Sequence, residues 1–393
     1  MRHWILVTLS LVALWLILWG AISLRMGSLP EGRAEAVTCL GYRVGYWSVL
    51  PFAILLYPLD PLRITSHAGI ATGIAVLMLA PFVFWFLARR KKRLIDRPVS
   101  GPEASGRRLF LTKTSGKLLG IATVGVAADS IVLSPQRLQI RRYDIPVNDL
   151  PKSLDGVRIV HISDTHYGPF ITLEFLREVI REANAEKPDY VMLTGDYVHQ
   201  TPAAIRGGIS IFRELRPRVA TVAVLGNHDH WEGAEDCRKE FHSIGVPMFD
   251  NRRQFLTMSG LTPEPVAESL CLAGVGDYWT DDVLIAKTLE GVPQAMPRLM
   301  LSHNPDVAEV APRDERIDLM LSGHTHGGQV WLPALGTPKV PSYYGQKYAG
   351  GLVEAPTCRV IVSRGVGMAI LPVRFCVPPE ISVITLSRSL QRG

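Results

Sequence analysis

Apolar residues are distributed very differently in the two parts of the chain. The first of four long apolar segments has 21 residues without a charge, and as a helix rising 1.5 Å per residue it would span about 31 Å, which matches the apolar core of a bilayer. We therefore expect residues 1–135 to form a membrane region. Its apolar segments are 4–24, 44–59, 68–88 and 118–133, the last of which carries Asp129.

Basic residues predict how this region is oriented. The stretch 89–117 carries ten Lys and Arg, and such residues are enriched on the cytoplasmic side of a membrane. If all four segments cross, the chain after residue 133 lies outside the cytoplasm. Arg107-Arg108 before an apolar stretch also resembles a twin-arginine export signal, so segment 118–133 is either a span or a cleaved export signal. Both interpretations place the following domain outside the cytoplasm, and the multi-pass membrane region predicts that the protein is located at the cell membrane.

From about residue 150 the pattern changes to short apolar runs that alternate with amphipathic stretches. Runs of four to eight apolar residues bounded by turn-forming residues are typical of strands, and apolar residues spaced three and four apart are typical of helices. Thr172 is placed to cap the first helix. The predicted helices are 172–185, 203–215 and 232–243, and the predicted strands are 157–163, 189–194, 219–225, 270–275, 298–302, 317–322, 359–363 and 381–386.

Strand–helix alternation followed by a strand-rich half predicts an α/β domain over residues 150–390. Its expected architecture is two packed mixed β-sheets flanked by helices, a four-layer sandwich. About 240 residues are enough for one large domain. The sequence thus predicts a membrane region followed by one catalytic or binding domain.

Composition narrows the classes of function. Residues 1–150 hold 18 Lys and Arg against 8 Asp and Glu, whereas residues 151–393 hold 24 against 28. The basic balance of the whole chain therefore belongs to the membrane region, and no nucleic-acid partner is expected for the larger domain. The five cysteines are scattered without a CxxC motif, which excludes a disulfide framework or a thiolate zinc site as the organising principle.

Polar side chains follow five of the predicted strands at the point where each strand ends, which is where α/β sheets place their ligands. Each motif alone is common in turns, but five of them at strand ends predict one shared site of carboxylate, amide and imidazole groups. These are ligands of divalent metals rather than of soft, thiolate-bound ions. The motifs are Asp164-Thr165-His166, Gly195-Asp196, Gly226-Asn227-His228-Asp229, Ser302-His303-Asn304 and Gly323-His324-Thr325-His326.

In this order the five motifs resemble those of the calcineurin-like metallophosphoesterases, across roughly residues 157–386. The family pattern is DxH, GD, GNH followed by Asp or Glu, a lone His, and GHxH. The tail is also similar to that of a membrane-attached bacterial phosphodiesterase branch. The tail motifs are Gly327-Gly328-Gln329, Ser363-Arg364-Gly365-Val366-Gly367, Arg374-Phe375 and Pro378-Pro379-Glu380.

The resemblance implies two divalent metal ions per chain, such as Mn, Zn or Fe. One metal would be bound by Asp164, His166 and His326, the other by Asn227, His303 and His324, and Asp196 would bridge them. It further implies a hydroxide between the metals as nucleophile and His228 as general acid for the leaving oxygen.

The chain departs from the family pattern at one position. Many relatives carry Asp three residues after the bridging Asp, where this chain has His199. Either Asp229 takes over the orientation of His228, or His199 contacts substrate. His230 is a second candidate for substrate contact, and Trp231 after it could line the same cleft. His161 inside a strand is expected to be a core histidine. Tyr343, Tyr344 and Lys347 lie in a long loop that could meet substrate.

These features predict a membrane-anchored dimetal phosphoesterase that hydrolyses a phosphodiester or pyrophosphate bond. The membrane region favours a lipid-linked or envelope-associated substrate. One alternative is a UDP-2,3-diacylglucosamine-type pyrophosphatase of lipid A assembly, whose reaction is cytoplasmic and conflicts with the expected orientation. Another is a non-catalytic, metal-bearing membrane scaffold, which the intact ligand set disfavours. A transporter is disfavoured because the apolar segments are few. The oligomeric state stays open.

Overall fold

The structure is a computed structural model that describes residue 130 and residues 134–332, 336–370 and 372–389. Apart from Ser130, the four predicted apolar segments lie outside the described residues. Within the described part of the chain, no helix combines the length and the apolar character needed to cross a membrane.

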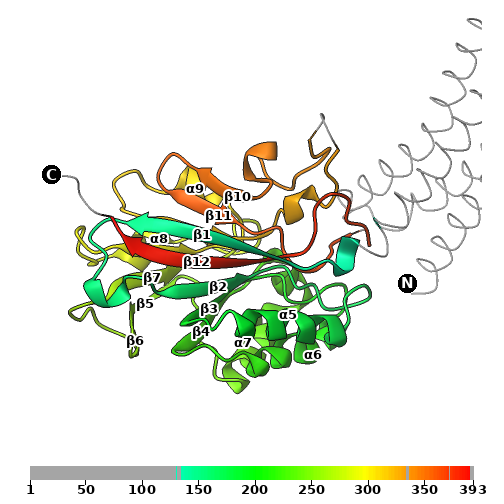
Figure 1. The fold of residues 1–393 in the computed structure, drawn as a ribbon, viewed down its shortest axis with the longest axis horizontal. Helices are drawn as coiled ribbons and strands as arrows, with labels where there is room; N and C mark the ends of the chain where they lie inside the picture. The colour runs from blue at the N-terminus through cyan, green and yellow to red at the C-terminus, as the bar shows by residue number, and fades with distance from the viewer. Residues whose placement is uncertain (1–129, 131–133, 333–335, 371, 390–393) are drawn as a thin grey trace, which may run out of the picture. The chain divides into compact units, whose positions relative to one another are not determined.

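Five strands form the first sheet, in the order β1–β12–β2–β3–β4 (Figure 1). Strands β2, β3 and β4 are parallel, β12 is antiparallel to β2, and β1 is parallel to β12. The sheet is therefore mixed, and β2, β3 and β4 all end at the same edge. Its strands are β1 (Gln139–Val147), β2 (Arg158–Ile162), β3 (Tyr190–Thr194), β4 (Ala220–Val224) and β12 (Glu380–Arg388).

Seven strands form the second sheet, in the order β10–β11–β9–β8–β7–β5–β6. Its four central strands, β11, β9, β8 and β7, are parallel, and the outer strands are antiparallel to their neighbours. The strands are β5 (Arg252–Thr257), β6 (Gly260–Thr262), β7 (Leu270–Gly274), β8 (Arg298–Leu301), β9 (Leu319–Ser322), β10 (Gly351–Glu354) and β11 (Arg359–Val362).

The helices cover the outer faces of the two sheets. In Figure 1, α5, α6 and α7 lie along one face of the first sheet, and a buried cluster of their side chains packs on Val160, Val191 and their neighbours. The second sheet is covered by α8 and α9, which pack on side chains such as Met300. The helices are α5 (Leu173–Ala185), α6 (Ile205–Ser210), α7 (Asn227–Ser243), α8 (Ile285–Leu289) and α9 (Val307–Val310).

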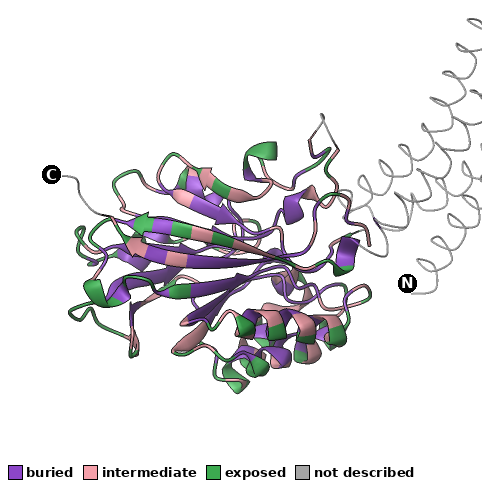
Figure 2. Cartoon of the chain, in the orientation of Figure 1, coloured by how far each residue is buried: buried purple, intermediate pink, exposed green. Residues whose placement is uncertain are grey.

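The central strands are apolar on both faces because each sheet has a covering layer on both sides. Along β2, Ile159 belongs to the cluster between the sheets, whereas Val160 and Ile162 face the helices. In Figure 2 the central strands are correspondingly buried along their length, while the helices expose one side. The predicted α/β fold of two mixed sheets with flanking helices is confirmed.

All eight predicted strands are present, each within two residues of its expected bounds. The helix predicted at 172–185 is also confirmed, and the Thr172 hydroxyl accepts a hydrogen bond from the Phe175 amide at 3.2 Å. The helix predicted at 203–215 is divided into α6 and a 3-10 turn, η5 (Ile211–Glu214).

Four strands, the two short helices α8 and α9, and one helix start were not predicted. β1, β5, β6 and β10 are partly exposed, so their apolar residues do not form the continuous runs that mark the central strands. The helix expected at 232–243 instead begins at Asn227, because the GNHD motif itself forms its first turn. The part of α7 that begins with the motif and the part that was predicted from its sequence meet at Gly233, whose φ of 140° is non-helical.

Candidate metal centre

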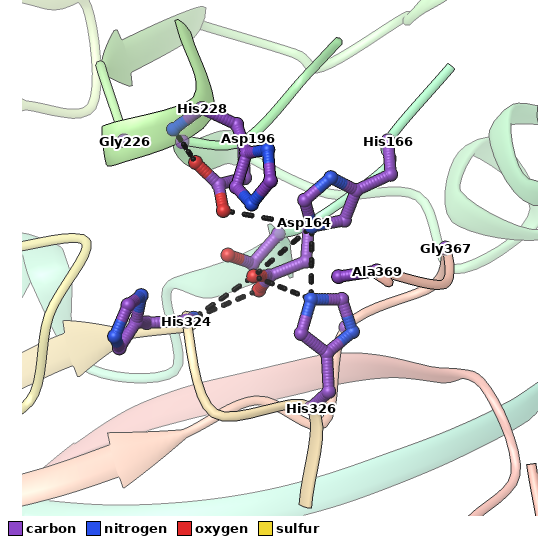
Figure 3. Close-up of polar contacts among 12 residues, drawn as sticks. Asp164, His166, Asp196, Gly226, His228, His324, His326, Gly367 and Ala369 are labelled. Carbon is purple, nitrogen blue, oxygen red and sulfur yellow. Dashed lines mark hydrogen bonds and ion pairs between the residues drawn. The ribbon is translucent and has the colours of Figure 1, made fainter. Parts of the chain in front are cut away.

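The five motifs converge at one edge of the two sheets. Each follows the carboxyl end of a strand: β2, β3, β4, β8 and β9. Figure 3 shows the side chains of Asp164, His166, Asp196 and His326, from the loops after β2, β3 and β9, gathered around one point. The seven predicted ligands are all buried. They are Asp164, His166, Asp196, Asn227, His303, His324 and His326.

The first group of potential ligand atoms comes from the loops after β2 and β9. Asp164, His166 and His326 each direct one such atom to a common point. The Nε2 atoms of His166 and His326 are 2.9 Å apart, and His326 Nε2 lies 3.3 Å from Asp164 Oδ1. If both imidazoles are neutral, each of these nitrogens can carry a lone pair that points toward the other ring. A metal cation placed between the two nitrogens would bind both lone pairs.

The second group lies beside the first and comes from the loops after β3, β8 and β9. Asp196, His303 and His324 direct their ligand atoms together, with His324 Nδ1 3.2 Å from His303 Nε2. The buried Oδ1 of Asn227 has no hydrogen-bond partner among the described residues. A buried acceptor without a donor is costly unless a cation or water satisfies it, which fits the ligand role predicted for Asn227.

Asp196 lies between the two groups. Its Oδ2 atom is 3.5 Å from His166 Nε2 and 3.2 Å from His303 Nε2, while its Oδ1 accepts a hydrogen bond of 2.8 Å from the His228 amide. One oxygen therefore faces both groups and the other fixes the side chain. This is the geometry expected of a carboxylate shared by two cations.

The electrostatics of the site favour cations. Burial raises the pKa of Asp164 to about 7, an effect that His303 opposes and Asp196 reinforces. Burial also acts to raise the pKa of Asp196, but the surrounding histidines, His303 first, hold it well below its ordinary value. Two buried carboxyls this close cannot both be charged without a positive partner. Divalent cations would supply that charge, so the donor set fits the predicted metals.

The backbone is strained where the ligands sit. Five of the seven predicted ligands have φ in the left-handed region, at values from 44° to 69°. Such conformations cost about 1–3 kcal/mol each and persist only where the surroundings impose them. The residues are Asp164, His166, Asp196, His324 and His326.

Two glycines allow the loops to approach one another. A Cβ at Gly226 would lie 2.4 Å from Asp196 Oδ1, and one at Gly323 would lie 1.9 Å from Ser163 Oγ. Neither contact is sterically allowed for a side chain, which explains why both the GNHD and the GHTH motifs begin with glycine.

Asp229 organises the backbone around Asp196. Its Oδ2 accepts hydrogen bonds from the amides of Asp196 at 2.7 Å and Gly226 at 2.9 Å, and its Oδ1 accepts one from Tyr197 at 2.8 Å. No contact of Asp229 with the His228 ring is found among the described residues. The carboxylate thus joins the loop after β3 to the start of α7, and it does not replace the missing Asp as a partner of His228.

His199 takes the place beside His228. The Nδ1 atoms of the two rings are 3.1 Å apart, and the His166 ring packs edge-on against both. Burial lowers the pKa of His199 to about 4, with His228 adding to the effect. One neutral imidazole can donate to the other through these atoms, so His199 is placed to orient His228.

We expect Asp229→Asn to lower both the stability and the activity of the protein. An asparagine offers one acceptor oxygen where the carboxylate accepts three N–H groups, and unpaired buried donors cost about 1–3 kcal/mol. A thermal unfolding scan should show a lower Tm, and hydrolysis should fall because Asp196 loses its backbone support.

The matched control is Asp236→Asn, also on α7, whose side chain is 69% exposed. This variant should behave as wild type. Equal unfolding temperatures for the two variants would contradict the role given to Asp229.

The other predicted site residues lie outside these groups. His230 faces Asp281, with Nε2 3.8 Å from Oδ2. His161 is a core histidine as expected, with Nε2 2.7 Å from the Thr194 hydroxyl. In the long loop, Tyr343 is 77% exposed, whereas Lys347 pairs with Glu309.

Three further residues contact side chains of the site, and of these Trp279 and Arg374 were not predicted to do so. The Trp231 ring packs edge-on against His228 with centroids 4.7 Å apart, and the Trp279 ring packs against His324 at 4.2 Å. The buried guanidinium of Arg374 lies 3.5 Å from His326 Nδ1. Trp279 follows β7 in the sequence GDYW, so its position after a strand was a usable signal.

Comparison with known proteins gives a match to one family and to several relatives. The model of the calcineurin-like phosphoesterases matches residues 157–328. The chain is 32% identical over 285 residues to the uncharacterized metallophosphoesterase YkuE of Bacillus subtilis, a match that covers 71% of this chain and 97% of that protein.

Two further relatives carry more descriptive names. A transmembrane protein with metallophosphoesterase domain from Danio rerio is 29% identical over 324 residues, covering 80% of this chain and 71% of that protein. The phosphodiesterase YaeI of Escherichia coli is 33% identical over 236 residues, covering 58% of this chain and 82% of that protein.

Proposed function

The chain belongs to the calcineurin-like phosphoesterase family, whose members are metal-dependent hydrolases of phosphoesters, and on this premise we propose that it cleaves a phosphodiester or pyrophosphate bond at a dimetal centre. The observation that carries the proposal is the position of Asp196 Oδ2, within 3.5 Å of a ligand atom in each of two His-containing groups. The name of the Escherichia coli relative supports the diester.

In this proposal Asp164, His166 and His326 hold one cation, and Asn227, His303 and His324 hold the other, with Asp196 shared. Two such cations, when bound, neutralise the phosphoester and lower the pKa of an attacking water. Mn, Zn and Fe all suit this oxygen and imidazole set.

His228 is the proposed general acid. Its ring lies beside the first group, with centroids 4.7 Å from the ring of His166. Its backbone amide is bound by Asp196 Oδ1, so the residue is held in place by the carboxylate that joins the two groups. From this position the ring donates a proton to the leaving oxygen as the P–O bond breaks. Contact with His199 leaves Nε2 as the nitrogen available for that transfer.

We further propose a membrane region at residues 1–135 and a catalytic domain at residues 150–390, exposed outside the cytoplasm. The apolar segments and the ten basic residues of 89–117 support this arrangement. The Danio rerio relative is itself named a transmembrane protein. A substrate that is lipid-linked or part of the envelope follows from this location.

Removal of the metals is expected to abolish activity and lower stability together. Dialysis of the full-length protein against a chelator should end hydrolysis of bis-(p-nitrophenyl) phosphate and lower the Tm by about 5–10 °C, because the buried carboxyls lose their counter-charge. Mn²⁺ should restore both properties, and metal analysis should give two ions per chain. Full turnover after dialysis would contradict the proposal.

A substrate profile distinguishes the alternatives. Full-length protein with Mn²⁺ is assayed on a soluble diester, a monoester and a nucleoside-diphosphate lipid. Preference for the diester supports a phosphodiesterase, whereas sole activity on the nucleoside-diphosphate lipid supports the lipid A alternative. Stoichiometric metal without turnover of any substrate would indicate the non-catalytic scaffold.

A further inference from the structure

The chain enters the catalytic domain at the edge that carries the metal centre. β1 runs parallel to β12, pairing Gln139 with Glu380, and β12 runs antiparallel to β2. The start of β1 therefore lies at the edge where β2 ends and Asp164 begins its loop. Five residues lie between Gln139 and the end of apolar segment 118–133, so the six steps of chain reach about 20 Å at most.

Ser130, within that apolar segment, makes direct contact with the loops of the site. Its carbonyl accepts a hydrogen bond of 3.0 Å from the Arg374 amide, and the Arg374 guanidinium lies 3.5 Å from His326 Nδ1. Arg374 thus links Ser130 to a predicted metal ligand.

Large apolar side chains are exposed at the same edge. Trp231 is 58% exposed beside His228, and Trp279 is 41% exposed beside His324. Trp331 is 44% exposed, and its amide donates to the carbonyl of Phe375, the residue after Arg374. Ile370, 52% exposed, follows Ala369, which is labelled beside the site in Figure 3.

These four side chains, Trp231, Trp279, Trp331 and Ile370, are called the aromatic rim below. The rim contains all three tryptophans of the described residues. Tryptophan is enriched at membrane interfaces because its ring is apolar while its indole N–H still reaches polar groups. A surface that exposes these three tryptophans around one site is suited to rest on lipid.

We propose that the aromatic rim docks on the bilayer surface, and that the metal centre takes acylated phosphoesters directly from that leaflet. This inference rests on the membrane attachment and the phosphoesterase activity proposed above. Hydrolysis there breaks one P–O bond: water supplies the hydroxyl to phosphorus, His228 donates the proton to the leaving oxygen, and the remaining proton of the water restores His228. The acylated fragment stays in the bilayer and the polar fragment leaves into water.

Depth-sensitive fluorescence tests the docking without relying on activity. In the full-length chain, Cys39 and Cys376 are replaced by Ser, which leaves three buried cysteines. Trp331→Cys is then labelled with an environment-sensitive fluorophore in liposomes that contain nitroxide-labelled phospholipid. The matched control is Val266→Cys, a position that is 46% exposed just before the start of β7, at the opposite edge of the sheet.

We expect at least about threefold stronger lipid quenching at position 331 than at position 266. Equal quenching at the two positions would overturn the docking. Turnover of bis-(p-nitrophenyl) phosphate by the same preparations reports the proposed function separately, so a protein that docks but does not hydrolyse contradicts only the function.

Competition tests the acylated substrate class. Phosphatidic acid in vesicles should inhibit turnover of the soluble diester at a concentration about tenfold lower than glycerol 3-phosphate does, because the acyl chains concentrate it at the rim. Combined Trp331→Ala and Ile370→Ala substitutions should remove most of this difference, whereas Val266→Ala should retain it. Equal inhibition by the two compounds in the wild-type protein would overturn the substrate class.

Discussion

Asp196→Asn is expected to lower kcat/KM for bis-(p-nitrophenyl) phosphate by at least about 10³-fold while leaving a folded domain. The substitution keeps the oxygen that accepts from the His228 amide at 2.8 Å, so the local backbone retains its support. It replaces the other oxygen, which faces His166 and His303, with an uncharged NH₂ group. This group donates hydrogen bonds and cannot bind a cation. Steady-state kinetics and metal analysis of the purified full-length protein measure both effects.

The control for this substitution is Asp314→Asn, which removes a carboxylate from an exposed position. It should retain wild-type turnover and metal content. Wild-type turnover in Asp196→Asn would rule out the shared carboxylate and with it the dimetal assignment.

His228→Ala is expected to lower kcat by about 10²–10⁴-fold, the usual contribution of a general acid. Metal content should not change, because His228 is not among the proposed ligands. The loss should be largest for substrates with poor leaving groups and small for p-nitrophenolate, which leaves without a proton. Rates for an alkyl phosphodiester and for bis-(p-nitrophenyl) phosphate, compared in one preparation, measure this difference.

His199→Ala provides the companion measurement. If His199 acts only by orienting His228 through the 3.1 Å contact, the variant that combines His199→Ala with His228→Ala should be no slower than His228→Ala alone. Additive losses would show that His199 acts on substrate independently, and an equal loss for both leaving groups in His228→Ala would contradict its role as acid.

The sequence predicted the parts of the fold that local pattern determines. The eight predicted strands are buried apolar runs, and each ends in turn-forming glycine or polar residues. Because the motifs follow predicted strands at the ends where α/β sheets place their ligands, Asp164, Asp196 and His303 were expected to share one site, and the structure brings them together around His166 and Asp196. The order of motifs along the chain therefore carried most of the information about the site.

The contacts between motifs could not be predicted in this way. Asp229 binds the backbone of Asp196, 33 residues away, and His199 meets His228 across the same gap between two loops. Such contacts depend on how strained loops fold over each other, and nothing in the local sequence states that Asp229 faces backbone amides rather than an imidazole. The exposed strands were missed for a different reason, since β1 has few inward-facing apolar residues.

The most direct measurement is anomalous scattering from crystals of the full-length protein grown with Mn²⁺. We predict two peaks, one beside Asp164, His166 and His326 and the other beside Asn227, His303 and His324, with the Asp196 carboxylate between them. A single peak, or peaks that Asp196 does not join, would contradict the shared-carboxylate centre.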